Sequence, residues 1–336
     1  MNKIIITGGL GFIGSHLTKK LLENNKVLVI DKMTYAANNS NLSKFNNNPN
    51  FFFEKKDVSN FKKINNIIKD FKPDKIFHLA AESHVDRSID NADEFIKTNI
   101  LGTYSLLEAV LEYRKSFEKK ELIFHHVSTD EVFGDVKDRG KINDLSESDS
   151  FTENSKYFPS SPYSASKASS DHLVSAWGRT YDLPYVISNC SNNYGPFQAK
   201  EKFIPYVISS AVEGKKISIY GDGNQIRDWI YVTDHIDAII KLSESGAKGF
   251  FNIGGDCQIR NIDLAKKILK KLDIIFPQKK KNSSYLDLIS YVDDRPGHDV
   301  KYAIDNTKII NSTNWRPSIS LDEGLELTLD WYLKKN

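Results

Sequence analysis

The sequence predicts an α/β protein in which a doubly wound parallel sheet is followed by a smaller mixed lobe. Short β-branched runs alternate with segments whose apolar residues recur at helical spacing. This alternation is regular as far as residue 190 and becomes irregular after about Asn192. Repeated strand and helix alternation is typical of parallel sheets that carry helices on both faces. We therefore expect a sheet domain over residues 1–190 and a second lobe over 191–336, with the chain crossing between them.

Within residues 1–190 the expected elements follow one another with short connections. Strands are expected at 3–7, 26–30, 51–55, 75–79, 122–128 and 185–189. Helices are expected at 12–24, 61–70, 92–115 and 163–181. The Asn-rich stretch 37–50 and the polar, Ser-rich stretch 135–162 favour loops, and we expect the second loop to lie beside a site.

The signals in residues 191–336 are sparser and suggest a smaller lobe without internal repeats. Its expected strands are at 217–220 and 250–253, and its expected helices are at 234–243, 262–272 and 321–333.

Composition excludes several classes of protein. The 336 residues include 46 Lys and Arg against 44 Asp and Glu, so there is no large basic field of the kind that nucleic-acid binding requires. No apolar run reaches about 18 residues, so we expect no membrane span. Two cysteines, Cys190 and Cys257, cannot form a disulfide framework and suit a reducing compartment, so we expect a cytoplasmic protein.

A glycine-rich turn follows the first expected strand. Gly8, Gly11 and Gly14 allow a tight turn and a close backbone approach to a pyrophosphate, whose charge the following helix N-terminus favours. The second strand ends in Asp31, 17 residues after Gly14, near the spacing of about 20 expected for an acid that binds the ribose. Such an acid repels a 2′-phosphate, which favours NAD over NADP, although the cationic Lys32 follows it. We therefore predict a Rossmann-like NAD site.

A second motif places a phenol and an ammonium on one face of an expected helix. Tyr163 and Lys167 are four residues apart. A tyrosine normally keeps its proton up to a pH near 10, but a lysine cation and the positive charge of the cofactor favour the phenolate. Together the two residues could supply a base for a sugar hydroxyl.

A third motif is the pair Asp130 and Glu131, just after the strand expected at 122–128. Side chains at the carboxyl end of a parallel strand open into the crevice where ligands bind. Adjacent carboxyl groups in different surroundings can hold different protonation states, so one could act as an acid and the other as a base. A solvated acidic turn is the alternative for this dipeptide.

Four histidines could suggest a metal centre, but their pattern argues against one. His78, His84, His125 and His126 lie on or beside strands without a helical i, i+4 pair or a cysteine partner. We expect hydrogen-bonded structural histidines and no metal.

These motifs together resemble the extended short-chain dehydrogenases/reductases of the nucleotide-sugar branch. The run 127–134, with its Asp-Glu pair, closely resembles the active-site segment of dTDP-glucose 4,6-dehydratases, and the resemblance continues through 78–89, 188–196, 221–229 and 294–299. The chain departs from the family pattern at Leu10, Ala37 and Phe133, where Ala, Gly and Tyr are frequent. None of these departures removes a group that the chemistry needs.

The resemblance implies a set of site residues. Catalysis would fall on Thr129, Asp130, Glu131, Tyr163 and Lys167. NAD would contact Gly8, Gly11, Phe12, Ile13, Gly14, Asp31, Lys32, Met33, Thr34, Asp57, Val58, Leu79, Ala80, Ala81, Glu82, Ser83, Thr98, Tyr163, Lys167 and Asn193. The nucleotide sugar would contact Ser83, Thr129, Asn192, Lys202, Phe203, Arg227, Asn261, Arg295 and His298, whose cations suit a diphosphate.

The family reaction implied is an NAD-dependent dehydration of dTDP-glucose to dTDP-4-keto-6-deoxyglucose. A 4-epimerase or decarboxylase on the same scaffold is the alternative among enzymes, and a catalytically silent NAD-binding sensor is the alternative outside enzymology. The resemblance also implies a homodimer, in which the expected helices 92–115 and 163–181 would pair. The preference for thymidine or uridine nucleotides stays open.

Overall fold

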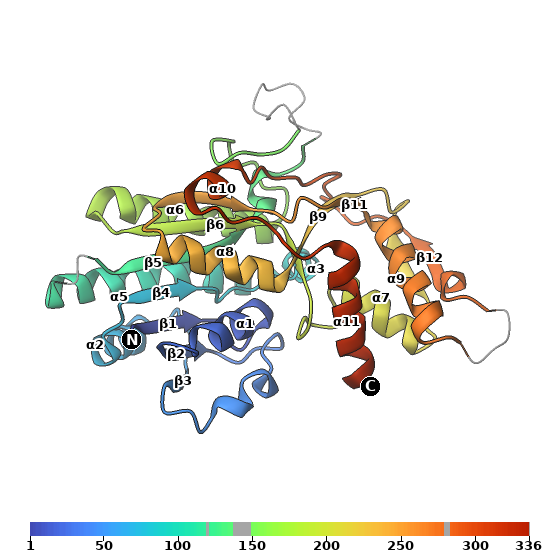
Figure 1. The fold of residues 1–336 in the computed structure, drawn as a ribbon. Helices are drawn as coiled ribbons and strands as arrows, with labels where there is room; N and C mark the ends of the chain where they lie inside the picture. The colour runs from blue at the N-terminus through green and yellow to red at the C-terminus, as the bar shows by residue number, and fades with distance from the viewer. Residues whose placement is uncertain (119–120, 137–148, 279–282, 336) are drawn as a thin grey trace.

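The computed structural model describes residues 1–118, 121–136, 149–278 and 283–335. At its centre is a seven-stranded sheet in the order β10-β6-β5-β4-β1-β2-β3, in which all neighbouring strands run parallel. Helices cover both faces of this sheet, and a smaller lobe lies beyond the carboxyl ends of its strands (Figure 1). The architecture confirms the predicted doubly wound α/β fold with a mixed second lobe. The strand order reverses between β1 and β4, which places a ligand crevice there.

Residues 1–190 form the main part of the sheet and most of its helices. The elements are β1 (Lys3–Thr7), α1 (Phe12–Leu21), β2 (Lys26–Asp31), β3 (Phe51–Lys55), α2 (Phe61–Phe71), β4 (Lys75–His78), α3 (Val85–Asp90), α4 (Asp93–Phe95), η3 (Ile96–Leu101), α5 (Gly102–Phe117), β5 (Ile123–Thr129), η4 (Asp130–Phe133), α6 (Pro162–Tyr181) and β6 (Tyr185–Cys190). The helix expected at 92–115 is present but interrupted, because η3 is a π-helical turn between α4 and α5. The loop expected at 37–50 contains two short 3₁₀ turns, η1 (Asn39–Asn41) and η2 (Ser43–Phe45).

The second lobe contains two small sheets and three longer helices. Its elements are β7 (Asn192–Tyr194), α7 (Phe203–Val212), β8 (Ile217–Tyr220), β9 (Ile226–Tyr231), β11 (Gln258–Arg260), α9 (Asn261–Ile275), η6 (Tyr285–Leu288), β12 (Ile289–Val292) and α11 (Leu321–Lys335). One sheet has the order β11-β9-β7, with β9 antiparallel to β11 and parallel to β7, and the other pairs β8 with β12. Of these elements, α7, β7, β9, β11 and β12 were not predicted from the sequence.

Three elements that follow β9 return to the main sheet. Helix α8 (Val232–Glu244) packs against α1, β10 (Gly249–Ile253) pairs with β6 at the sheet edge, and α10 (Thr307–Thr313) packs against α8 and β10. The division of the sequence at residue 190 stays a proposal, since the chain passes repeatedly from one part to the other. The expected loop at 135–162 lies partly outside the described residues, because 137–148 are not among them.

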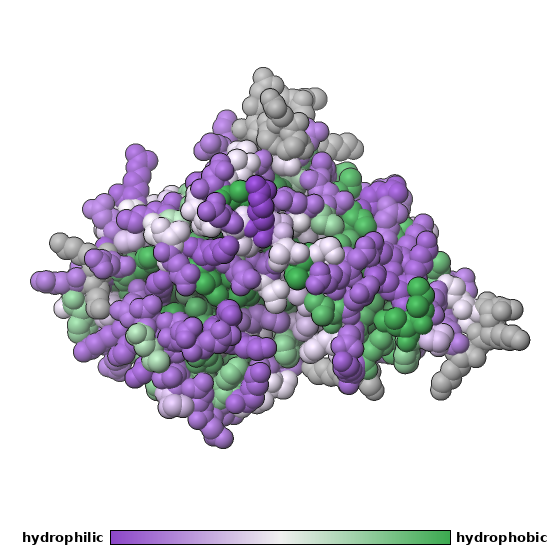
Figure 2. Space-filling model, in the orientation of Figure 1, coloured by the Kyte–Doolittle hydropathy of each residue, from purple (hydrophilic) through white to green (hydrophobic). Residues whose placement is uncertain are grey.

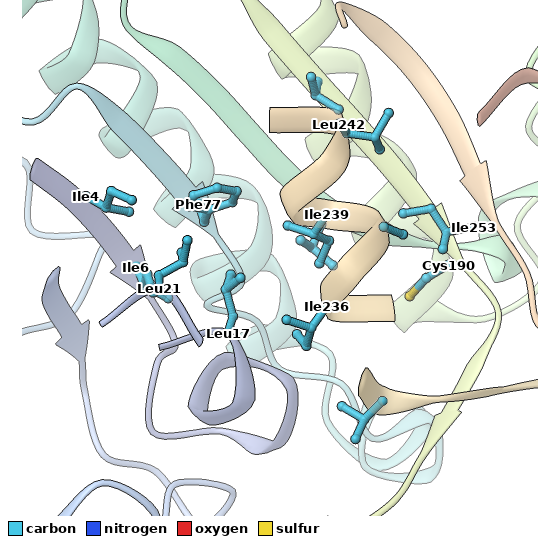
Figure 3. Packing of buried hydrophobic residues seen from close by; sticks show 14 of the residues in the cluster. Ile4, Ile6, Leu17, Leu21, Phe77, Cys190, Ile236, Ile239, Leu242 and Ile253 are labelled. Atoms are coloured by element: carbon cyan, nitrogen blue, oxygen red, sulfur yellow. The ribbon is translucent and has the colours of Figure 1, made fainter. Parts of the chain in front are cut away.

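Apolar side chains fill both faces of the main sheet. On one face Leu17 and Leu21 of α1 and Ile236 and Ile239 of α8 pack over the strands (Figure 3). A second cluster lies between the strands and helices α2, α5 and α6, and a third fills the smaller lobe. Hydrophilic side chains dominate the visible surface (Figure 2). In the part of the chain that the structure describes, no helix is long and apolar enough to cross a membrane.

Candidate active site

A deep cleft opens where the carboxyl ends of the main strands face the second lobe. Most of the residues proposed from the sequence line it, from both halves of the chain. They are Gly8, Gly11, Phe12, Ile13, Gly14, Asp31, Lys32, Thr34, Val58, Leu79, Ala80, Ala81, Glu82, Ser83, Thr98, Thr129, Asp130, Glu131, Tyr163, Lys167, Asn192, Asn193 and Lys202. The fold therefore brings the glycine turn, the Tyr-Lys pair and the Asp-Glu pair into one site.

The glycine turn fits a dinucleotide closely. A Cβ at Gly14 would lie 2.2 Å from the Gly8 carbonyl oxygen, and a Cβ at Gly8 would lie 2.7 Å from the Ala80 nitrogen. Side chains are thus excluded from the turn where it meets the start of α1, which leaves the backbone and its N–H groups to a pyrophosphate. A glycine turn with free backbone N–H groups at a helix start fits the pyrophosphate of NAD.

The acid at the end of β2 is held in a fixed position. Asp31 accepts hydrogen bonds from the Leu10 N–H at 3.1 Å and the Met33 N–H at 2.7 Å. Burial raises its pKa, and these two N–H groups oppose the rise. The neighbouring Lys32 is engaged elsewhere: its Nζ lies 2.7 Å from Thr98 Oγ1 and 3.3 Å from Glu82 Oε1. Lys32 is therefore already paired with acidic and polar partners, which supports the choice of NAD over NADP.

Helix α6 places Tyr163 and Lys167 at the base of the cleft. Its N-cap is Ser161, whose hydroxyl accepts from the Ser164 N–H at 3.1 Å in a reciprocal capping box, and Pro162 is the first helical residue. Both site side chains are buried. Lys167 Nζ donates to the Val127 carbonyl oxygen at 2.9 Å.

The protein groups around Tyr163 act on its protonation. Burial and then the charge of Glu131 raise the pKa of this phenol well above its ordinary value, while a hydrogen bond with Thr129 opposes the rise. The pKa of Lys167 is lowered by burial, and the charge of Asp171 opposes that change. The protein groups alone therefore favour the protonated phenol, because burial and the nearby negative charge outweigh the hydrogen bond from Thr129.

Asp130 and Glu131 occupy the 3₁₀ turn η4 directly after β5. Thr129 ends the strand, and its hydroxyl donates to Asp130 Oδ1 at 3.3 Å and accepts from the Glu131 N–H at 3.3 Å. Asp130 is fully buried, and burial followed by the charges of Glu131 and Asp228 raises its pKa well above the usual range. The surroundings of Asp130 therefore favour its protonated form.

Glu131 lies in different electrostatic surroundings from Asp130. Its withdrawal from water raises its pKa, but Arg295, Arg227 and Lys202 act in the opposite direction. These cations come from the second lobe, so both parts of the chain shape the pair. The two carboxyl groups thus differ as a catalytic acid and base should.

The remaining expected substrate residues surround the cleft on the second lobe. Arg227 is buried, lies 4.3 Å above the ring of Tyr302 and donates to the Asp299 carbonyl oxygen at 2.9 Å. Arg295 pairs with Asp86 at 2.9 Å, and His298 pairs with Asp294 at 2.6 Å. Lys202 bridges the parts by donating to the Ser83 carbonyl oxygen at 2.8 Å.

Seven of the expected contact residues are not among the side chains that line the cleft itself. They are Met33, Asp57, Phe203, Arg227, Asn261, Arg295 and His298. Asp57 turns its carboxylate to the Ser59 N–H at 2.8 Å, and Phe203 and Asn261 begin α7 and α9.

Structural roles account for the histidines on the strands. His78 lies between Thr7 Oγ1 at 2.7 Å and Thr103 Oγ1 at 2.9 Å, and His125 contacts Ser188 Oγ at 3.0 Å. Burial lowers the pKa of both, so they are neutral. Among the described residues no group of three or more His, Cys, Asp or Glu side chains could hold a metal ion.

Comparisons with known proteins identify the family. A family model described as GDP-mannose 4,6 dehydratase matches residues 5–328. A dTDP-glucose 4,6-dehydratase from Haemophilus influenzae is 49% identical over 340 residues, which cover 99% of this chain and 98% of that protein. The chain belongs to the dTDP-glucose 4,6-dehydratase family.

Solved structures agree with this family assignment. A dTDP-glucose 4,6-dehydratase from Streptomyces venezuelae, solved with NAD, superposes with a TM-score of 0.87 at 35% identity, covering 99% of this chain and 97% of that one. A UDP-glucose 4-epimerase from Thermotoga maritima reaches a TM-score of 0.83 at 29% identity, covering 99% of each chain. Since epimerases share the scaffold, the side chains in the cleft must distinguish the reactions.

Sequence reasoning missed one part of this dTDP-glucose 4,6-dehydratase site. A buried group consisting of Asp171, His126, Ser128, Tyr157 and Asn189 lies against Lys167. A sequence signal was available, because Asp171 follows Lys167 by four residues and Tyr163 by eight, which places all three on one helix face. The other members come from three separate segments, β5, the stretch before α6 and β6, and only the fold brings them together.

Proposed function

We propose that this protein is a hydro-lyase that dehydrates dTDP-glucose to dTDP-4-keto-6-deoxyglucose. The observation that carries the proposal is the position of Asp130 and Glu131 in the same cleft as Tyr163, with the two carboxyl groups in different electrostatic surroundings. A 4-epimerase needs a base for the 4-hydroxyl but no second acid and base. The membership of the dTDP-glucose 4,6-dehydratase family supports the same reaction.

NAD would be held by the glycine turn, Asp31, and the residues from Leu79 to Ser83 that follow β4. When bound, NAD would accept a hydride from C4 of the sugar and return it to C6 later in the same cycle. The chain would position the cofactor by backbone contact at the glycine turn and by hydrogen bonds from the Asp31 carboxylate to the ribose.

In the first step Tyr163 takes the proton of the sugar 4-hydroxyl. The Thr129 hydroxyl orients the same oxygen, since it hydrogen-bonds Tyr163 and lies at the end of β5. Because the protein groups alone raise the pKa of Tyr163, the phenolate depends on positive charge from Lys167 and the bound cofactor. The sugar then carries a ketone at C4.

In the second step the ketone acidifies the proton on C5, and the Glu131 carboxylate removes it. Asp130, which holds its proton, donates it to the departing 6-hydroxyl, and water leaves. Glu131 then returns its proton to C5 as C6 is reduced. Tyr163 releases the proton it took from the 4-hydroxyl, and Asp130 takes up one proton, so both residues regain their starting states. The cycle consumes no external reductant, and its net change is the loss of one water.

The nucleotide would lie against the second lobe. Lys202, Arg227, Arg295 and His298 surround this side of the cleft and supply cationic or hydrogen-bonding groups for a diphosphate. Ser83, Asn192, Phe203 and Asn261 complete the proposed substrate contacts. This set does not choose between thymine and uracil.

We also propose that the protein is a cytoplasmic homodimer with no nucleic-acid or membrane partner. Helices α5 and α6, with the turn before α5, present large apolar side chains to solvent: Ile96, Leu101, Tyr104 and Tyr181 are 48%, 50%, 44% and 42% exposed. A second copy pairing along these helices would cover them.

The test is mass spectrometry of the product formed without added reductant from dTDP-glucose deuterated at C4, with UDP-glucose in parallel. We expect dTDP-glucose to lose one water and to keep the deuterium at C6. An unchanged mass with inverted C4 would show a 4-epimerase. No reaction with either sugar, from protein that retains NAD, would favour a non-catalytic role.

A further inference from the structure

A buried carboxylate lies behind Lys167, and the steps described above do not use it. Asp171 is on α6 with no exposed surface, and it is absent from the residues that line the cleft. Its position one turn after Lys167, and two turns after Tyr163, makes a continuous stripe of three buried ionisable groups on one helix face. Burying an ionisable side chain is costly unless partners compensate it, so the partners of Asp171 show what it does.

The hydrogen bonds of Asp171 all go to one of its oxygens, Oδ2. Oδ2 accepts from Ser128 Oγ at 2.8 Å, from the Tyr157 hydroxyl at 2.9 Å and from Asn189 Nδ2 at 3.2 Å. Oδ1 lies 3.2 Å from His126 Nε2. Three donors on one oxygen fix the carboxylate rigidly and favour its ionised form.

His126 lies between this carboxylate and Lys167. Its Nε2 lies 3.2 Å from Lys167 Nζ as well as 3.2 Å from Asp171 Oδ1. Burial and the charge of Lys167 lower the pKa of His126 well below its ordinary value, so the ring is neutral. Since its Nε2 accepts from the Lys167 ammonium, it has no hydrogen to donate to Asp171, and the carboxylate and the ammonium attract each other electrostatically across the ring.

Five other titratable groups lie around Lys167, His126 and Asp171. They are His78 on β4, Tyr157 before α6, Tyr163 and His172 on α6, and Cys190 at the end of β6. Burial lowers the pKa of His78 and raises the pKa of Tyr157, Tyr163 and Cys190, which keeps these four neutral. His172 contacts only the outer edge of the group, through the Tyr157 ring at 5.4 Å. Lys167 and Asp171 are thus the opposite charges that compensate each other.

We propose that Asp171 is a positioning residue for the oxidation step, whose negative charge, fixed behind His126, keeps Lys167 charged. Lys167 is the protein cation nearest to the phenol in sequence and shares its helix face, so its charge supports the phenolate that the 4-hydroxyl requires. Asp171 does not touch the sugar or the cofactor. The inference rests on the proposed function, and it adds the group that maintains the charge of Lys167.

The test compares D171N with the wild type across pH, using kcat for the dehydration of dTDP-glucose. Burial raises the pKa of Asp171 to about 6, so below that pH the wild type also carries a neutral side chain at this position. We expect the ratio of wild-type to D171N kcat to be near one at acidic pH and to rise with pH, reaching up to about 100-fold above neutrality. KM for dTDP-glucose stays unchanged.

A matched control separates the effect of the Asp171 charge on Lys167 from a general disturbance of buried packing on α6. Ser170 is the neighbouring buried residue on α6 and hydrogen-bonds the carbonyl oxygens of Asn99 at 2.7 Å and Ser166 at 2.9 Å. S170A removes buried hydrogen bonds but no charge, so any loss of kcat that it causes should be the same at every pH. A D171N effect that is equally independent of pH would overturn the proposal.

A second variant keeps the proposal testable if D171N does not fold. Y157F removes one donor to Asp171 Oδ2 and leaves the carboxyl group, so the pKa of Asp171 should rise further. The ratio of wild-type to Y157F kcat should then be largest just above pH 6 and return towards one at higher pH; a flat ratio would contradict the proposal.

The same series of variants distinguishes failure of the proposed function from failure of the proposed role of Asp171. If the wild type releases no dehydrated product, that function is wrong, and the absorbance of the reduced cofactor formed with the sugar then reports the oxidation step in its place. If the wild type turns over and both variants show flat ratios, only the role of Asp171 is wrong.

Discussion

Asp130 and Glu131 are adjacent in the chain, yet their surroundings assign them opposite tasks. Asp130 is buried beside a second acid, Asp228, which favours its protonated form, while Glu131 faces three cations of the second lobe. The sequence could predict the pair and its chemistry. It could not predict which residue is the acid, because that depends on side chains about 100 and 170 positions further along the chain.

Replacing Glu131 by Gln should leave NAD bound but block the removal of the C5 proton. We expect kcat to fall by about 10²- to 10⁴-fold, the usual contribution of a general base. Product mass and the incorporation of solvent deuterium at C5 would be measured. E326Q, on the exposed face of α11, is the control, and unimpaired turnover of E131Q would remove Glu131 from its role.

The raised pKa of Asp130 predicts a loss of activity at alkaline pH. The acid form is the active one, so elimination should proceed below the raised pKa and decline as pH rises through it. The rate of water loss from the 4-keto sugar, followed against pH, should show this alkaline limb. In D130N most of the rate of water loss should disappear, and the remaining rate should no longer decline at alkaline pH. If the alkaline decline persists in D130N, it belongs to another group.

At the scale of single elements, the regular strands and helices were predictable and the irregular ones were not. Strands β1 and β3 have the predicted bounds, and the others near the sheet centre differ by a residue or two. Their signal is local, because a β-branched run or an apolar stripe is written in the element itself. Strands β7 and β11 have only three residues each, and β9 carries the charged Arg227 and Asp228, so their pairing depends on partners distant in the sequence.

The start of α1 should not tolerate a side chain at Gly14. In G14A the new Cβ would meet the Gly8 carbonyl oxygen at 2.2 Å, so the turn must shift. We expect the purified variant to lose its cofactor and about 1–3 kcal/mol of unfolding free energy, as overpacked sites do. G246A is the control for cofactor binding: its Cβ would meet nothing within 4 Å, so it should keep the cofactor, although the φ of +73° at Gly246 makes alanine cost some stability there as well.

The N-cap of α6 should contribute to stability more than to chemistry. S161A removes the acceptor for the Ser164 N–H and half of the capping box. We expect a loss of about 1 kcal/mol in the free energy of unfolding, measured by urea denaturation. S169A, on the exposed side of the same helix, should cost less than about half of that. Equal losses would show that the cap is unimportant.

For the molecule as a whole, exposed apolar side chains predict a specific assembly. If α5 and α6 pair with a second copy, introducing charge at Leu101 and Tyr104 should yield monomers in sedimentation experiments, because burying carboxylates opposes association. I274E is the control, since Ile274 is 80% exposed at the end of α9, away from these helices. A dimer that survives L101E/Y104E must use another surface.

The return of α8 and β10 to the main sheet affects how this enzyme can be modified. The second lobe is not one continuous insert, because the chain leaves the sheet after β6, comes back for α8 and β10, and leaves again for β11 and α9. A new sugar specificity therefore cannot be introduced by exchanging a single cassette. A chimaera would need several separate grafts with matched junctions, so changes in substrate range are easier to reach by single substitutions around the cleft.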